Sequence, residues 1–410
     1  MTTQNNNTAH FDPIVTAAAH LLAQRMSVPI QLTDVVCISE AERRNRLLRV
    51  RVDNPPPGLP ASVIIKQVVA QAYNPDQIDS EDTQRFFRDW AGAEFLSNLP
   101  GDPGHGPRFY GGDRQLGFII LEDLGQNQHS LVQPLLEGNA ASAEAALITY
   151  IRRLGQMHAD TLGKAAEYRT LWPTANPALK VAAITQGLET RGLQYLSTVL
   201  PELDLPVDPA LLTELQGIYK RVEQPGPFGA FVHADLCPDN MFFASGEVGD
   251  TARDTVGDAV RLIDFEFARF GHALFDICYP RMLFPGCWCC NRIPQAIVVK
   301  LESVYRAELC RTCSAVADDH LYTQALADVC GFALLEETLP WQLPVALEEN
   351  RQWGLVTVRT RLLASLEAFI DTATEFDRLP QFRNAASQLL ATLQARWPET
   401  EPLPFYPAFR

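Results

Sequence analysis

Two short segments that combine strand-like apolar residues with polar side chains constrain the fold of this chain most strongly. The first, FVHADLCPDNMFF, contains the pattern His-x-Asp-x4-Asn, formed by His233, Asp235 and Asn240. The second, VRLIDFE over residues 260–266, ends in Asp-Phe-Glu. Their Phe, Val, Leu and Ile content predicts strands, and the Gly-, Asp- and Thr-rich stretch 245–258 predicts a long hairpin tip between them.

Each part of this pattern has a plain structural alternative, but the combination has fewer. His-x-Asp alone is common, and an Asp after a Leu-Ile pair is often a turn residue at a strand end. Together the side chains suit phosphoryl transfer, in which a protein orients a hydroxyl and holds metal ions against phosphates. Asp235 would accept or align the hydroxyl proton, and His233 would support the loop backbone. Asn240 and Asp264 would hold Mg²⁺, with Glu266 as a further candidate ligand, because Mg²⁺ prefers hard oxygen ligands.

The order His-x-Asp-x4-Asn followed by Ile-Asp-Phe-Glu resembles the catalytic core of the aminoglycoside phosphotransferase and choline kinase-like family. This family is the small-molecule branch of the protein-kinase-like fold. The resemblance implies an α+β, two-lobed structure, with a small antiparallel-sheet lobe over residues 1–121, a hinge over 122–126 and a mostly helical lobe over 127–410. It also implies ATP and Mg²⁺ as cofactors, and a hydroxyl of a small metabolite or antibiotic as the phosphate acceptor.

The resemblance implies further parts upstream, and the sequence contains candidates for them. Residues 61–69 (ASVIIKQVV) predict a strand that carries Lys66, which in the family pattern pairs with nucleotide phosphates and is held by a Glu of the next helix. Residues 83–99 predict that helix, with Glu94 as the partner of Lys66. The structural alternative is that Glu94 lies on a solvated face while Lys66 extends to solvent from an edge strand.

The expected nucleotide site has two other parts. Residues 117–125 (GFIILEDLG) predict a strand that leads into the hinge, where the backbone of Glu122 and Leu124 would contact adenine. The segment 38–50 contains no glycine, so it lacks the phosphate-covering loop of protein kinases, and Asn45 lies where a less glycine-rich loop would end. A P-loop pattern is absent as well.

Composition narrows the partners of the chain. The 410 residues include 47% hydrophobic and 20% charged residues, which indicates a folded globular protein. A net charge of −15 argues against nucleic acid as a partner, and agrees equally with a cationic acceptor or with simple solubility. Residues 12–26 predict a capped helix, and neither a secretory signal nor a membrane-spanning run is evident. We therefore expect a cytoplasmic enzyme without a membrane partner. The sequence does not indicate an oligomeric state.

The nine cysteines predict reduced thiols, given the expected location. Two pairs have the spacing of a structural zinc site, Cys287 with Cys290 and Cys310 with Cys313. A helix predicted over residues 294–309 would hold the pairs about 24 Å apart, at 1.5 Å per residue. Buried, unligated cysteines are therefore the favoured interpretation, with zinc as the alternative.

The remaining sequence predicts a helical region with several supporting residues. A helix over 141–163 carries His158, which we expect to be a hydrogen-bonded structural residue. Asp276 resembles a buried Asp of the family that accepts hydrogen bonds from the catalytic-loop backbone, with a helix cap as the alternative. Helical patterns follow near 294–312, 318–338, 350–375 and 380–397. Glu336, Glu337 and Trp341 are candidates for an acceptor cavity, although Glu after an apolar helix is usually exposed.

Two competing functions stay open at this point. A catalytically silent, nucleotide-binding member of the same fold would use the same nucleotide residues. A protein kinase is disfavoured because the glycine loop and an Ala-Pro-Glu segment are missing and Asp-Phe-Glu replaces Asp-Phe-Gly.

Overall fold

The computed structural model describes residues 12–40, 42–101, 103–126, 129–175, 191–243 and 260–410. The predicted hairpin tip over 245–258 lies outside the described residues. The chain forms two compact units. The first unit consists of three separate stretches, Met1–Gln128, Ala166–Thr185 and Arg261–Ala268, and the second contains the rest of the chain.

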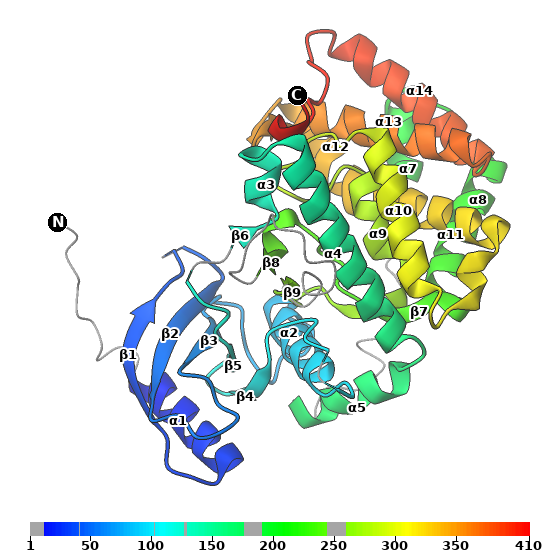
Figure 1. The fold of residues 1–410 in the computed structure, drawn as a ribbon. Coiled ribbons are helices and arrows are strands. Elements are labelled where there is room, and N and C mark those ends of the chain that lie inside the picture. Colours follow the sequence, from blue (N-terminus) through cyan, green and yellow to red (C-terminus); the bar gives the residue numbers. More distant parts are fainter. Residues whose placement is uncertain (1–11, 41, 102, 127–128, 176–190, 244–259) are drawn as a thin grey trace. The chain divides into compact units, whose positions relative to one another are not determined.

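The first unit is built on a five-stranded antiparallel sheet with the strand order β1-β2-β3-β5-β4 (Figure 1). The strands are β1 (Gln31–Cys37), β2 (Asn45–Asp53), β3 (Ser62–Val68), β4 (Phe109–Asp113) and β5 (Phe118–Glu122). Its helices are α1 (Asp12–Met26), α2 (Glu81–Ser97) and α5, which begins at the boundary of the unit (Ala165–Ala175). The strands and helices predicted upstream of the hinge are thus present.

The two faces of this sheet carry different residues. One face packs against α1, where Leu22 of the helix meets Val63 and Ile65 of β3 in a buried apolar cluster. Successive side chains of a strand point to opposite faces, so Lys66 lies on the other face. There α2 packs on the sheet, and the ring of Trp90 lies 5.7 Å from that of Phe109 in β4. Alternation along β3 therefore places one buried cation opposite the apolar core.

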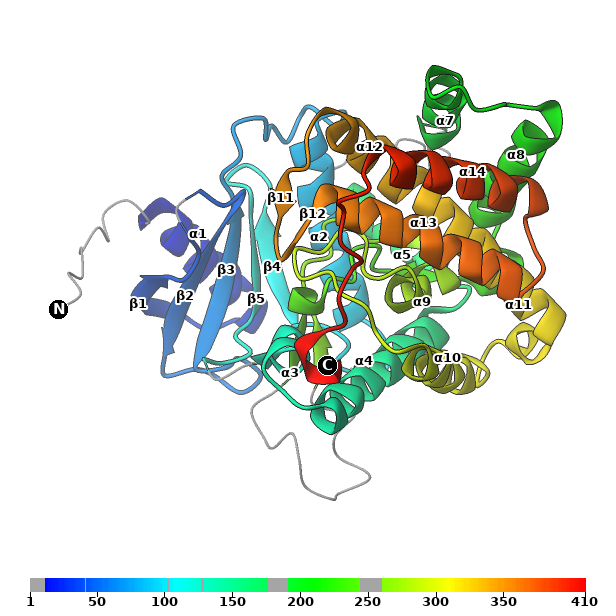
Figure 2. The same cartoon turned by 90° about the horizontal axis from the view of Figure 1, so that it is seen from above.

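The second unit is mostly helical. Its helices are α3 (Val132–Leu136), α4 (Ala140–Thr161), α7 (Arg191–Glu202), α8 (Pro209–Glu223), α9 (Leu274–Arg281), α10 (Gln295–Leu309), α11 (Asp319–Phe332), α12 (Leu339–Glu348), α13 (Val358–Glu375) and α14 (Pro380–Arg396). Figure 2 shows α13 and α14 side by side, and the rings of Phe369 and Phe382 meet between them at 4.5 Å. The predicted α+β class, with an antiparallel sheet followed by a mostly helical part, is confirmed.

Short strands of the second unit carry the motif-bearing loops. They are β6 (His129–Ser130), β7 (Gly229–Val232), β8 (Met241–Phe243), β10 (Arg269–His272), β11 (Gln352–Trp353) and β12 (Val356–Thr357). β7 pairs antiparallel with β10, and β6 with β8. The chain passes into the first unit within β9 (Val260–Leu262) and returns after Ala268.

Two predicted helices differ from those observed. The helix expected over 318–338 ends as α11 at Phe332 and continues through a π-helical turn, Ala333–Thr338, into α12. The helix expected from residue 350 begins only at Val358, because residues 352–357 form the β11–β12 hairpin. Gly354 turns this hairpin with a φ of 64°, and a Cβ at this position would come within 1.9 Å of the carbonyl oxygen of Trp288. Only glycine fits so close to another backbone.

Among the described residues, no helix is both long enough and apolar enough to cross a lipid bilayer.

Candidate active site

A buried carboxylate holds the loop that carries the His-x-Asp pattern. The loop follows β7, and Asp276 of α9 accepts hydrogen bonds from the backbone amides of His233 at 2.7 Å and Ala234 at 2.9 Å. Ala234 adopts a left-handed backbone conformation with a φ of 61°, which is uncommon for a residue other than glycine. The two bonds to Asp276 stabilise this conformation. The predicted role of Asp276 as an acceptor for the loop backbone is therefore confirmed, and the helix-cap alternative is wrong.

Two histidines complete the support of this loop. His158 of α4 is fully buried; its Nε2 lies 3.1 Å from Asp276 Oδ2 and its Nδ1 lies 2.6 Å from the Tyr305 hydroxyl. Burial alone would raise the pKa of Asp276, but the hydrogen bonds from His158 and from the His233 amide hold it below its ordinary value. His233 is also fully buried, and its Nδ1 accepts a hydrogen bond from the Asp235 amide at 3.3 Å. Both histidines thus have the structural contacts that the sequence predicted.

The polar side chains at the end of the loop contact each other directly. Asn240 lies in a short 3₁₀ turn, Pro238–Asn240, and its Nδ2 donates to the Asp235 carbonyl at 2.9 Å and to Asp235 Oδ2 at 3.2 Å. This contact orients the carboxylate of Asp235. Because the amide nitrogen of Asn240 is used in this way, metal coordination by Asn240 would fall to its Oδ1.

The first unit contains a second charged cluster, centred on Lys66. The Lys66 ammonium lies 2.7 Å from Asp89 Oδ2 and 2.5 Å from Asp264 Oδ1. Asp89 of α2 also accepts a hydrogen bond from the Phe265 amide at 2.9 Å through its other oxygen. Asp264 itself has a left-handed φ of 68°. One side chain of α2 therefore fixes both the ammonium and the Asp-Phe-Glu turn.

The predicted pairing of Lys66 with Glu94 is wrong. Glu94 instead accepts a hydrogen bond from Trp90 Nε1 at 2.9 Å. Residues five apart on an α-helix differ by about 140° in direction, so Asp89 and Glu94 cannot face the same cation. Asp89 is only 5% exposed although its helix neighbours are largely apolar, and an acidic residue in such surroundings was the available signal.

Charge in this cluster is unbalanced toward the acidic side. Arg85 lies 3.2 Å from Glu266, so two cations face the three carboxylates of Asp89, Asp264 and Glu266. Burial would lower the pKa of Lys66, but the nearby carboxylates of Asp264 and Asp89 raise it above its ordinary value. Burial and the Asp264 carboxylate raise the pKa of Glu266 to about 7. This acidic excess supplies the hard oxygen ligands that Mg²⁺ prefers, but the three carboxylates are not grouped closely enough to hold a metal ion by themselves.

Of the other candidates for the nucleotide site, Asn45 lies with Lys66, whereas Glu122 and Leu124 lie at the end of β5. Asn45, Lys66, Asp89 and Glu266 line one cavity of about 10 Å³ within the first unit. Glu122 accepts a hydrogen bond from the Arg108 amide at 3.1 Å, so its side chain belongs to the sheet edge. Leu124 is half-buried directly after β5. Asp123, between them, receives bonds from Arg49 and Ser62 and anchors the strand ends.

The expectation that all nine cysteines are reduced thiols is wrong for two of them, because Cys237 and Cys287 form a disulfide. A disulfide sulfur has no thiolate to offer a metal, so the pairing takes Cys287 out of the zinc alternative. Cys290 donates to the Leu283 carbonyl and Cys313 to the Pro227 carbonyl, as unligated thiols do. Within the described ranges, no three His, Cys, Asp or Glu side chains are grouped in a way that could hold a metal ion.

The three candidates for an acceptor cavity, Glu336, Glu337 and Trp341, have different surroundings. Glu336 accepts hydrogen bonds from the Gly192 amide at 2.7 Å and from the Tyr219 hydroxyl, which makes it a support of α7 and α8. Burial raises the pKa of Glu337; the Arg269 cation opposes this effect and the Asp235 carboxylate adds to it. Trp341 is 56% exposed and stacks on the Arg191 guanidinium at 5.0 Å.

Comparisons with known proteins give matches only among solved structures. No protein-family model matches the chain, and no curated protein sequence does. An ethanolamine kinase of Plasmodium vivax is 11% identical, with a TM-score of 0.44, over 87% of this chain and 84% of that one. A choline kinase of Streptococcus pneumoniae is 12% identical, with a TM-score of 0.41, over 88% of this chain and 99% of that one.

A macrolide 2′-phosphotransferase of type I is 14% identical, with a TM-score of 0.41, over 95% of this chain and 99% of that one. These proteins are small-molecule kinases and phosphotransferases, the kind of family that the two motif segments resemble. At these TM-scores, the function of this chain has to be argued from its own residues.

Proposed function

We propose that this protein is an ATP- and Mg²⁺-dependent kinase that transfers the γ-phosphate of ATP to a hydroxyl of a small metabolite or antibiotic. The observation that carries the proposal is the ion pair between Lys66 and Asp264, 198 residues apart in sequence and 2.5 Å apart in space. A lysine that meets phosphates and a carboxylate that meets their metal ion need to be neighbours, and few other chemistries need this pair.

Each charged group would then have a separate task. Lys66, held by Asp89, would neutralise nucleotide phosphates, while Asn45 and the backbone of residues 122–124 would contribute to binding the nucleotide. Mg²⁺ bound by Asp264, Glu266 and Asn240 would screen the charge of the phosphates. Asp235, oriented by Asn240, would accept or align the proton of the acceptor hydroxyl. His233 and Asp276 would keep this carboxylate in place through the loop backbone.

The acceptor class follows from charge more than from shape. Asp235 and Glu337 influence each other electrostatically in the second unit, where Arg269 and Arg191 also act on Glu337. Two carboxylates favour a cationic acceptor such as an aminoglycoside, a choline-like amine or an amino alcohol, while a sugar would rely on hydrogen bonds. We place the activity in the cytoplasm, where ATP is available.

The proposal is tested by an ATP-depletion screen against a panel of such alcohols. With the acceptor found, Asp235→Asn should lower turnover by roughly 100-fold or more while nucleotide affinity stays nearly unchanged, because the carboxylate acts on the hydroxyl. Asp377→Asn is the matched control, since Asp377 is exposed and has a left-handed φ of 49° that Asn tolerates.

The alternatives predict different results in the same screen. Nucleotide binding without ATP consumption, for any acceptor, would support a catalytically silent member of this fold. Phosphorylation of generic protein substrates in place of small alcohols would support a protein kinase. Unchanged turnover in Asp235→Asn would contradict the role of Asp235.

A further inference from the structure

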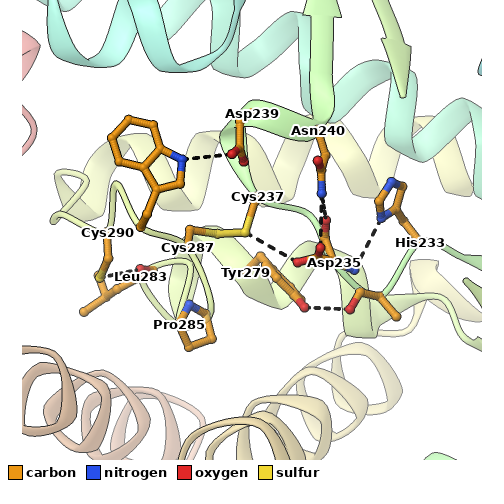
Figure 3. Close-up of a disulfide and its surroundings, with 12 residues drawn as sticks. His233, Asp235, Cys237, Asp239, Asn240, Tyr279, Leu283, Pro285, Cys287 and Cys290 are labelled. Carbon is orange, nitrogen blue, oxygen red and sulfur yellow. Dashed lines mark hydrogen bonds between the residues drawn. A yellow bond between two sulfur atoms is a disulfide. The ribbon is translucent and has the colours of Figure 1, made fainter. Parts of the chain in front are cut away.

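The disulfide between Cys237 and Cys287 lies directly beside the loop that carries Asp235 (Figure 3). Cys237 follows Asp235 by two residues and precedes Asn240 by three. Cys287 is 50 residues further along the chain, with a Cα–Cα distance of 5.3 Å across the bond. The bond therefore joins the candidate catalytic loop to the distant segment 283–290.

The segment 283–290 is a firm anchor for this bond. Arg361 of α13 is 1% exposed and donates to the carbonyls of Pro285 at 3.1 Å and Cys287 at 2.5 Å. Gln342 of α12 donates to the same Pro285 carbonyl at 3.0 Å. Two helices thus hold the backbone around Cys287, so a bond to Cys287 restricts Cys237 more than it moves Cys287.

The oxidation state of Cys237 also changes the surroundings of Asp235. The sulfur of Cys237 lies 3.4 Å from Asp235 Oδ1. In a disulfide this sulfur has no proton and cannot donate to the carboxylate, whereas a thiol at the same place is a weak donor. Reduction would therefore release the tether and add a donor at the oxygen that faces Cys237.

One contact between the two segments does not depend on sulfur. Trp288 Nε1 donates to Asp239 Oδ2 at 2.8 Å (Figure 3). This bond would keep the segments near each other after reduction, so that the disulfide can form again. Cys287 is fully buried and Cys237 is 8% exposed, so a dithiol would reach the bond at Cys237.

We propose that the Cys237–Cys287 pair is a redox-sensitive tether that positions Asp235, with high turnover in the oxidised form and low turnover in the reduced form. The inference rests on the proposed kinase function. Reduction breaks the protein S–S bond and forms one in a dithiol reductant, and the two dithiol protons pass to the two cysteine sulfurs. Disulfides in a reducing compartment are usually transient and redox-sensing, in agreement with this role.

The test compares the full-length protein after incubation with oxidised or reduced dithiothreitol. Differential alkylation and mass spectrometry should find Cys237 and Cys287 linked in the first sample and free in the second. Turnover should fall roughly tenfold on reduction, because a small displacement of a catalytic group costs one to two orders of magnitude, while the KM for ATP stays within about twofold. Hydrogen–deuterium exchange should rise in residues 233–241 on reduction.

Two variants separate the tether from general thiol effects. Cys287→Ser should resemble the reduced protein and no longer respond to the dithiol. Cys310→Ser is the control, since Cys310 is exposed and lies outside the disulfide, and it should keep the full redox response. If Cys287→Ser does not fold, the comparison of the two redox states needs no substitution.

Three outcomes would overturn the proposal: no linked pair under oxidising conditions, equal turnover and loop exchange in both states, or a fall in turnover on reduction that equals the loss of folded protein measured by circular dichroism. A bond that forms without altering the loop would be a structural cross-link only. If the oxidised protein consumes no ATP with any acceptor, the kinase function fails, and the loop exchange measurement still decides whether the tether exists.

Discussion

Two residues of the motif segments adopt a backbone conformation that their side chains do not favour. Ala234 and Asp264 both have positive φ angles, and neither is a glycine. Such conformations cost on the order of 1–3 kcal/mol and persist only where neighbouring contacts impose them. Asp276 imposes the first through two backbone amides, and Asp89 contacts the amide that follows the second. Strain at both segments agrees with a functional use of the side chains beside them.

Where a spacing pattern defined the candidate residues, the structure brings some of them into direct contact, Lys66 with Asp264 and Asn240 with Asp235. Asp235, Asn240 and Asp264 belong to such patterns, and Lys66 is the one charge in an apolar strand. Asp89 belongs to no spacing pattern. Its apolar neighbours in the sequence indicate burial, but choosing Asp89 over Glu94 as the partner of Lys66 requires the rotation of that helix against the sheet. The conformation of Ala234 is equally invisible, since alanine carries no sign of a left-handed turn.

The corrected partner of Lys66 gives a prediction for nucleotide affinity. Asp89→Asn leaves only one acceptor oxygen for two donors, the Lys66 ammonium and the Phe265 amide. We therefore expect the Kd of a non-hydrolysable ATP analogue to rise roughly tenfold or more, as for a lost hydrogen bond to a charged group. Glu94→Gln keeps an acceptor for Trp90 and should change the Kd by less than about twofold. Isothermal titration calorimetry measures both, and the opposite ranking would restore Glu94 as the partner.

Helices and strands with regular periodicity were predicted close to their observed bounds. The strand β3 and the helices α2, α4 and α10 follow this rule. The π-helical turn before α12 was not predicted, although Pro340, which has no amide to bond the carbonyl of Glu336, follows this turn in the sequence. The disulfide was missed because a separation of 50 residues carries no spacing signal.

A buried histidine at the end of the short β7–β10 ladder predicts that the free energy of unfolding depends on pH. His272 at the end of β10 is 5% exposed, stacks on Phe228 at 5.1 Å, and its Nδ1 accepts a hydrogen bond from the Leu274 amide at 3.2 Å. Burial, with a smaller contribution from His158, lowers the pKa of His272 to about 3. Between about pH 6.5 and pH 3 the unfolded chain therefore takes up a proton that the folded chain does not.

The free energy of unfolding should fall through that window as the pH decreases. His272 alone would contribute a loss of roughly 2 kcal/mol between pH 7 and pH 5. Urea unfolding at both pH values measures this difference, and His272→Gln should reduce it by about that amount. The exposed His320 is the matched control, because His320→Gln removes a ring that stays hydrated on folding. An equal pH dependence in wild type and His272→Gln would contradict the prediction.

At the scale of the whole molecule, the first unit gathers stretches that are far apart in the chain. Its sheet ends at Glu122, yet Asp264 and Glu266 belong to it as well, through residues 261–268. Periodicity in a sequence reveals which segments are strands or helices, but not which segment returns to an earlier one. The ion pair of Lys66 with Asp264 depends on this return, and only the family resemblance indicated it beforehand.

The proposed nucleotide site contains residues from distant stretches of the chain, which come together only on folding. Nucleotide binding should therefore raise the free energy of unfolding. A ligand at 100 times its Kd that binds only the folded state adds about 2.7 kcal/mol to the free energy of unfolding. For a chain of 410 residues this corresponds to an increase in Tm of roughly 3 °C. Differential scanning fluorimetry with an ATP analogue and Mg²⁺ should show the increase in wild type and in Asp235→Asn. Lys66→Met should abolish it, and an unchanged increase in that variant would remove Lys66 from the nucleotide site.

The hairpin at Gly354 sets a limit on how this molecule can diverge. Its turn rests against the main chain of Trp288, with no room for even a methyl group, and Trp288 in turn contacts Asp239 of the motif loop. A homologue that kept the contact between Gly354 and the Trp288 backbone could exchange most surface residues of the hairpin. It could lose the glycine only by displacing Trp288, so a substitution at this remote turn would also affect the motif loop through Trp288 and Asp239.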